Sequence, residues 1–62
     1  MIRLELSNDQ AETLAAVLES VLSDLRYEIA NTDSLDFRET LKLRKAMLMQ
    51  VVDQLAAARQ TV

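Results

Sequence analysis

One polar stretch, residues 31–34 with the sequence NTDS, separates two long segments in which apolar residues recur every three or four positions. Asn, Thr, Asp and Ser are weak formers of helix interiors, because their side chains hydrogen-bond to nearby backbone groups. In a chain without glycine or proline, these residues are the best candidates for a turn. We expect Asn31 to end the first helix in a left-handed conformation, and Asp33 or Ser34 to cap the second helix.

The phase of the apolar residues distinguishes a turn from one uninterrupted helix. The first segment carries an apolar stripe made of Ala11, Leu14, Leu18, Val21 and Leu25. Continued past the turn, that stripe would fall on Glu39 and Lys42, which cannot form an apolar seam. The stripe of the second segment is displaced by two residues and consists of Phe37, Leu41, Leu48, Val51, Leu55 and Ala58. A helical hairpin explains the displacement, whereas a continuous coiled coil does not.

The pattern predicts an all-α chain with a single domain over residues 1–62. The expected elements are a helix over 8–30, a turn over 31–34 and a helix over 35–59. Ser7 and Gln10 have the spacing of a capping box at the start of the first helix. Residues 2–6 alternate between apolar and charged side chains, which is typical of a short strand. We therefore expect residues 1–6 to form an extended arm, or a strand that pairs with its copy in a second chain.

The second segment has an apolar arc of about 200°, which is too wide for one neighbouring helix to cover. A chain this short usually needs a disulfide, a metal or a partner chain to be stable. The absence of Cys and His excludes disulfides and the usual zinc sites. We therefore expect the two-helix antiparallel hairpin to form a homodimer, a four-helix bundle. The sequence does not separate contacts within one chain from contacts between chains. The expected interface residues of both kinds together are Leu14, Leu18, Val21, Leu25, Leu41, Leu48, Val51, Val52 and Leu55.

The charges are unevenly distributed along the chain. Residues 1–36 contain eight acidic and two basic side chains, whereas residues 37–62 contain two acidic and five basic ones. This distribution is typical of an acidic helix that packs on a basic one. A nucleic-acid-binding patch over 38–45 is the alternative, but the acidic total and the lack of stacking aromatic residues argue against it.

Arg44 lies inside the apolar arc of the second segment. One reading is that its charged end reaches the edge of the core or pairs with Asp24 or Glu28. The alternative is a buried ion pair that determines which helices associate.

The composition leaves little room for catalysis. Without His, Cys and Gly, the chain lacks the common nucleophile–base pairs and phosphate-binding loops. Asp33, Asp36 and Glu39 are spaced like cation ligands, but acids in a first helical turn are favoured by the helix dipole alone. We expect no enzyme activity, no cofactor and no metal. No apolar run is long enough to cross a membrane and no signal peptide is visible, so we expect a cytoplasmic protein.

The stretch LSDLRYEIANTDSLDFRETLKLRKAML, residues 22–48, resembles short uncharacterised prokaryotic helical-hairpin proteins. These proteins carry a leucine-rich helix, an SDLR-x-EI-xx-TD segment and then an R-xx-LK-x-R segment. The matching residues are Ser23, Asp24, Leu25, Arg26, Glu28, Ile29, Thr32, Asp33, Arg38, Leu41, Lys42 and Arg44. The resemblance implies a polar network at the turn end of the bundle, either structural or a binding surface. Its members would be Asp24, Arg26, Glu28, Asp33, Arg38 and Arg44.

Ribbon-helix-helix repressors are a second comparison, since they too are small dimers with an N-terminal strand and two helices. This chain departs from them because its first helix is about twice as long and its turn lacks glycine. Its candidate strand has one basic residue, Arg3, and Glu5 would repel phosphates. The function that we expect is a non-enzymatic oligomerisation or protein–protein interaction module, with a second copy of the chain as the first candidate partner and another protein as the second. The alternative is a small dimeric DNA-binding regulator or antitoxin component.

Overall fold

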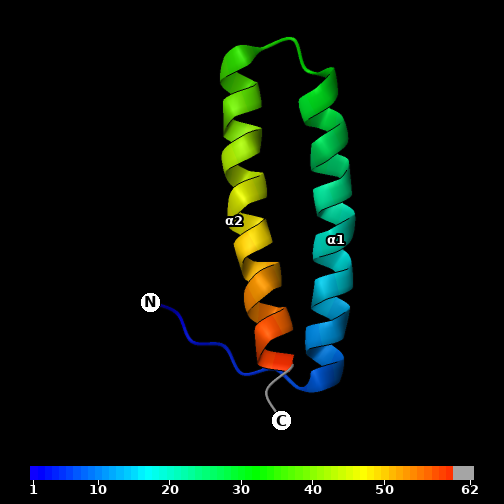
Figure 1. Ribbon diagram of the computed structural model, residues 1–62, viewed down its shortest axis with the longest axis vertical. Helices are drawn as coiled ribbons and strands as arrows, with labels where there is room; N and C mark the ends of the chain where they lie inside the picture. The colour runs from blue at the N-terminus through cyan, green and yellow to red at the C-terminus, as the bar shows by residue number, and fades with distance from the viewer. Residues whose placement is uncertain (60–62) are drawn as a thin grey trace.

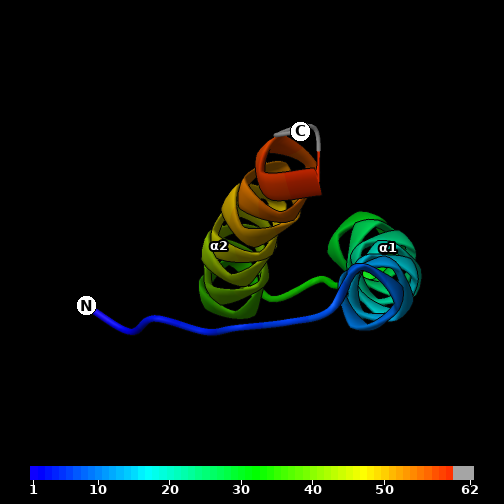
Figure 2. The ribbon, with the colours of Figure 1, turned by 90° about the horizontal axis from the view of Figure 1, so that it is seen from below.

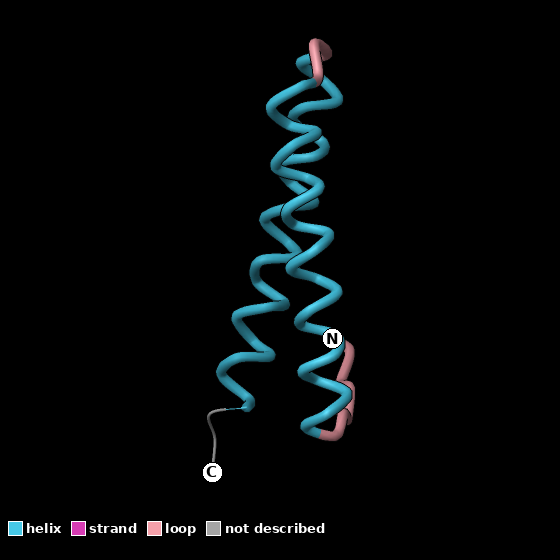
Figure 3. The backbone as a smooth tube through the Cα atoms, turned by 90° about the vertical axis from the view of Figure 1, so that its right-hand side faces the viewer, coloured by secondary structure: helices cyan, strands magenta, loops and turns pink. Residues whose placement is uncertain are grey.

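A computed structural model describes residues 1–59, which form two helices packed side by side (Figure 1). Helix α1 spans Asn8–Asn31 and helix α2 spans Leu35–Arg59. The chain reverses direction at residues 32–34, so the two helices are antiparallel and the predicted helical hairpin is confirmed. The molecule is elongated, measuring 44 × 23 × 14 Å, and the two helix axes are inclined to each other (Figure 3).

Residues 1–7 precede α1 without regular secondary structure. No strand occurs anywhere in residues 1–59, so the alternation over 2–6 does not produce a strand within a single chain. The physical reason is that a lone strand has no neighbour to accept and donate its backbone hydrogen bonds. The segment instead runs along one side of the hairpin, from the start of α1 past α2 (Figure 2).

The start of α1 has the predicted capping box. The Ser7 Oγ atom accepts a hydrogen bond from the Gln10 backbone N–H at 3.1 Å, and the Ser7 N–H donates to Gln10 Oε1 at 3.0 Å. These two bonds satisfy backbone and side-chain groups that have no partner inside the helix. Asp9 adds a negative charge to the positive end of the helix dipole.

The end of α1 differs from the prediction. Asn31 stays helical, and no residue in the described part of the chain has a positive φ, so the expected left-handed cap at Asn31 is wrong. Thr32 ends the helix instead, with an extended backbone (φ −86°, ψ 137°) and an N–H that donates to the Glu28 carbonyl at 3.0 Å. The extended route avoids the roughly 1–2 kcal/mol that a left-handed non-glycine residue costs. The Asn31 side chain donates to the Tyr27 carbonyl at 2.7 Å.

The start of α2 is fixed by Ser34 rather than by Asp33. The Ser34 Oγ atom accepts a hydrogen bond from the Phe37 backbone N–H at 3.2 Å. One turn later, the Arg38 guanidinium donates through Nη2 to the Thr32 carbonyl at 2.7 Å. The side chain of Arg38 therefore ties the first turn of α2 to the residue that ends α1.

The helices pack along a heptad seam, in which residues spaced alternately by three and four positions face the other helix. In α1 the seam consists of Ala11, Ala15, Leu18, Leu22, Leu25 and Ile29. In α2 it consists of Arg38, Leu41, Lys45, Leu48, Val52 and Leu55. The buried residues of the described chain all belong to it: Ala11, Leu22, Leu25 and Leu41. The other seam residues are half-buried, so the two helices alone enclose only a thin core.

Candidate interaction surface

Each helix carries a second stripe, one position before seam residues, which the hairpin leaves exposed except at the half-buried Leu14. The stripe of α1 consists of Leu14, Val21 and Glu28, and that of α2 consists of Phe37, Arg44, Val51 and Ala58. Within each stripe the spacing is seven residues, so its members point to the same side of their helix. We call these seven residues together the apolar face.

Two surface hollows show that both stripes lie on one side of the hairpin. Glu28 and Phe37 line the first hollow, together with residues of the turn region. Leu14, Val51 and Ala58 line the second, which has a volume of about 260 Å³. Because the heptad spacing is the same in both helices, Val21 and Arg44 lie between these two hollows, at one height along the hairpin.

The apolar face remains largely open to solvent in the single chain. Phe37 is 49% exposed, Val51 40% and Val21 37%. Val17 and Met47 flank the stripes and are 54% and 61% exposed. Exposed apolar patches are typical of protein interaction surfaces, whereas single scattered apolar residues are common on any protein surface.

The N-terminal segment reaches the apolar face without covering it. Ile2 and Leu4 line the same hollow as Leu14, Val51 and Leu55. Ile2 is nevertheless 92% exposed and Leu4 71% exposed. The segment therefore adds two apolar side chains to this side of the molecule and leaves the stripes accessible.

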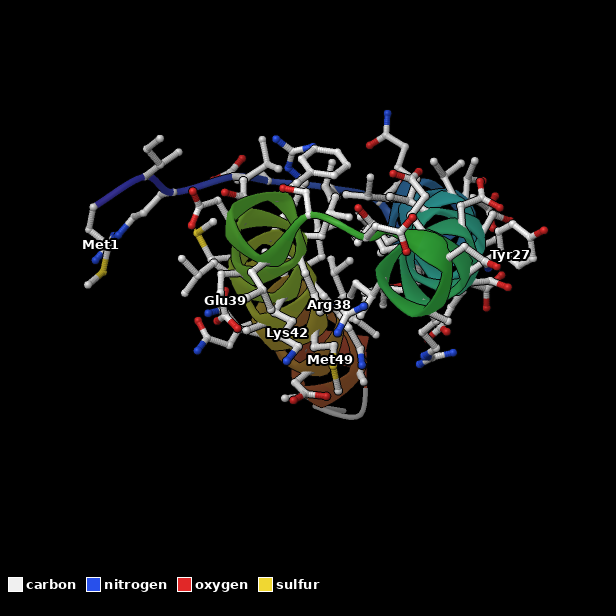
Figure 4. All side chains as sticks on the ribbon, turned by 90° about the horizontal axis from the view of Figure 1, so that it is seen from above. Met1, Tyr27, Arg38, Glu39, Lys42 and Met49 are labelled. Atoms are coloured by element: carbon white, nitrogen blue, oxygen red, sulfur yellow. The ribbon has the colours of Figure 1, made fainter. Side chains whose placement is uncertain are left out.

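The opposite side of the hairpin is predominantly polar. Figure 4 shows Arg38, Lys42 and Met49 on the side away from the N-terminal segment. The Lys42 Nζ atom lies 3.7 Å from Glu39 Oε1, and both side chains are more than half exposed. A hollow of about 100 Å³ on this polar side is lined by Glu19, Leu22, Arg26, Met49, Val52 and Asp53.

The structure divides the nine predicted interface residues into two groups. Leu18, Leu25, Leu41, Leu48, Val52 and Leu55 belong to the seam within one chain. Leu14, Val21 and Val51 belong to the open apolar face. The predicted set of interface residues omits Ala11 and Leu22, which are buried in the seam. The signal for both is the alternation of three and four positions that also contains Leu18 and Leu25.

The six residues of the predicted polar network do not lie together. Arg38 and Arg26 lie on the polar side, whereas Glu28 and Arg44 belong to the apolar face. Within residues 1–59, no ion pair joins any two of the six, the others being Asp24 and Asp33. The Arg38 side chain donates a hydrogen bond to the turn, at the Thr32 carbonyl, and its Nε atom is buried without a hydrogen-bond partner.

Among residues 1–59, no three acidic side chains gather as metal ligands, and Asp33, Asp36 and Glu39 remain exposed on the turn and the first turn of α2. Over residues 1–59, neither helix has an apolar stretch long enough to cross a lipid bilayer.

Comparison with protein-family models, with curated proteins and with solved structures finds no match for the chain.

Proposed function

We propose that this protein is a non-enzymatic self-association module, in which two hairpins pack through their apolar faces to form a four-helix bundle. The observation that carries the proposal is the amount of surface that the single chain leaves exposed. Its accessible surface is 5290 Å² for a mass of 7.0 kDa. A folded monomer of this mass typically exposes about 4,000 Å².

The excess of about 1,300 Å² is larger than the roughly 800 Å² that a standard protein interface buries on each partner, so it suffices for a stable interface. The segment before α1 contributes part of the excess, and the apolar face contributes another part. Because the stripes run along both helices on one side, a second copy related by a two-fold axis covers both stripes at once.

The thin core supports the same proposal. Four residues are buried in the described chain, and none of them is aromatic. Ordering a chain costs roughly 1.5 kcal/mol per residue, and short domains usually offset this cost with additional burial from a partner. Packing two apolar faces together adds Phe37, Val21 and Val51 to the buried side chains of each hairpin.

No observation favours the DNA-binding alternative. The basic residues of the 38–45 stretch are divided between two sides of the hairpin, with Arg44 on the apolar face and Lys42 on the polar side. A phosphate-binding surface needs its cations on one side.

Light scattering and circular dichroism over a dilution series test the proposal. We expect a mass of twice 7.0 kDa at high concentration, and a loss of helicity as dilution separates the chains. A fully helical chain whose mass stays at 7.0 kDa at every concentration would refute self-association.

A further inference from the structure

The segment over residues 2–6 alternates between three apolar side chains and two charges of opposite sign, Arg3 and Glu5. In the single hairpin the segment is exposed and has no regular secondary structure, and no ion pair within residues 1–59 involves either charge. We propose that two copies of this segment pair as an antiparallel two-stranded ribbon centred on Leu4. The ribbon closes the end of the four-helix bundle that lies opposite the turns. This inference rests on the proposed function.

The order of the side chains selects the register of this ribbon. Side chains that lie opposite each other in an antiparallel pair are on the same face, so apolar residues have to oppose apolar residues. Three registers that obey this rule pair most of the segment, and they are centred on residue 3, 4 or 5. The registers centred on Arg3 and on Glu5 place two like charges directly opposite each other, which is destabilising. The register centred on Leu4 instead places Arg3 opposite Glu5 of the partner subunit, and Ile2 opposite Leu6 of the partner subunit.

The helices provide an apolar surface on which the ribbon can pack. Ile2 and Leu4 line the hollow of about 260 Å³ on the apolar face, together with Leu14 and Val51. This hollow lies in the half of the hairpin away from the turn, where the segment runs from the start of α1 past α2 (Figure 1). Ile2 is 92% exposed and Leu4 71% exposed in the single chain, so one segment does not fill the hollow. The segment of a second chain adds three more apolar side chains at this end.

A two-fold axis parallel to the helices brings the two segments together. This rotation keeps each residue at its own height, so both segments cross the same end of the bundle and run in opposite directions. The two backbones then lie side by side between the two hairpins, and their side chains alternate between pointing into the bundle and pointing out of its end. The apolar side chains occupy the inside, and the charged ones face solvent. An axis across the helices places the segments at opposite ends, where they cannot pair.

The ribbon forms only as part of the dimer. An isolated two-stranded ribbon is at best marginally stable in water, which agrees with the lack of a strand in the single chain. Once the apolar faces hold two chains together, the segments are at high effective concentration, and hydrogen bonds between their backbones replace those to water. The exposed pairs of Arg3 and Glu5 add little affinity, and their main effect is to disfavour the two registers with like charges opposite each other.

Disulfide formation between single cysteines under mild oxidation measures the register. The chain contains no cysteine, so each substitution introduces one thiol per chain. Leu4→Cys places the two thiols of a dimer directly opposite each other, with Cβ atoms about 5 Å apart, so we expect it to cross-link with its own copy. Ile2→Cys and Leu6→Cys are the matched controls, because each leaves its own copies about 13 Å apart, too far for a disulfide. A mixture of these two variants places their thiols opposite each other, and we expect it to cross-link.

Charge reversal tests the pairing of Arg3 with Glu5 of the partner subunit, with the dimer dissociation constant as the readout. Arg3→Glu and Glu5→Arg each place like charges opposite each other at two positions of the ribbon. We expect each substitution to weaken the dimer about threefold or more at low salt, where surface charges are least screened. The double variant exchanges the two residues without changing the composition, restores opposite charges at both positions and should recover most of the affinity.

The outcomes separate this inference from the proposed function. Cross-linking in the expected pattern, together with recovery in the double variant, supports the ribbon. Cross-linking of all three single-cysteine variants with their own copies, or of none of them in a sample with the mass of a dimer, overturns the ribbon and leaves self-association intact. A double variant as weak as the single variants overturns the ion pairs. The mass of a monomer at every concentration refutes the proposed function as well.

Discussion

Replacing Val51 with glutamate probes whether the apolar face is the surface that a second chain covers. Val51 lies in the middle of the α2 stripe and is 40% exposed in the single hairpin. Met49 is its matched control, since it is on the polar side of the same helix and is 43% exposed. Val51→Glu and Met49→Glu therefore introduce the same charge at nearly the same exposure on opposite sides of the hairpin.

The magnitude follows from the surface that Val51 still has to bury. Full burial of a valine side chain stabilises by about 1.5–3 kcal/mol, so the exposed part of Val51 contributes about 1 kcal/mol per chain on dimerisation. A two-fold dimer contains this position twice, which makes the loss about 2 kcal/mol. Desolvation of each introduced carboxylate adds at least about 1 kcal/mol. The expected total exceeds about 3 kcal/mol, which is more than a hundredfold in the dimer dissociation constant.

Sedimentation equilibrium of both variants measures this difference. Helix propensity does not confound the comparison, because glutamate is as good a helix former as methionine and better than valine. We expect the dissociation constant of Val51→Glu to rise at least a hundredfold and that of Met49→Glu to change less than about threefold. Equal effects of the two substitutions, or a larger effect of Met49→Glu, would refute the assignment of the interface to the apolar face.

Substitutions at three further positions test the hairpin itself, with urea unfolding at a fixed chain concentration as the assay. Leu41→Ala should lower the free energy of unfolding by about 3 kcal/mol, because Leu41 is 1% exposed and its truncation leaves a cavity. A loss below about 1 kcal/mol would contradict the burial of Leu41. Ser7→Ala removes the acceptor of the Gln10 N–H and should cost about 1 kcal/mol, with faster hydrogen exchange of that amide. Arg38→Ala removes the donor to the Thr32 carbonyl and should lower the free energy of unfolding by about 1–2 kcal/mol. Arg38→Met keeps the aliphatic stem and removes the unpartnered Nε atom, so its free energy of unfolding should lie closer to that of the unsubstituted protein.

The helices and their starting caps were predictable, because the signals are local. The Ser7–Gln10 spacing and the polar residues at 31–34 each act over a few positions, and the structure has the hydrogen bonds that they imply. The end of α1 was not predictable in the same way. A left-handed Asn31 and an extended Thr32 both reverse the chain within a short turn, and the observed route also depends on the Arg38 side chain, which comes from the next helix.

The division between seam and open face required the register of the two helices. Val21 and Leu22 are adjacent, and both continue an apolar pattern with Leu18 and Leu25. Val21 is 37% exposed, whereas Leu22 is 2% exposed. A rotation of α1 by one residue would exchange their roles, because neighbouring positions are 100° apart on a helix. The register is set by packing against α2, which a pattern within one helix does not contain.

Contacts between the methyl groups of two different chains test the central claim most directly. A mixture of isotope-labelled and unlabelled protein, observed by a filtered nuclear Overhauser experiment, reports only contacts between chains. We predict that the methyl groups of Val21 and Val51 contact the other chain, and that the methyl group of Met49 does not. Contacts confined to Met49 and its neighbours, or none at all in the fully helical protein, would contradict association through the apolar face.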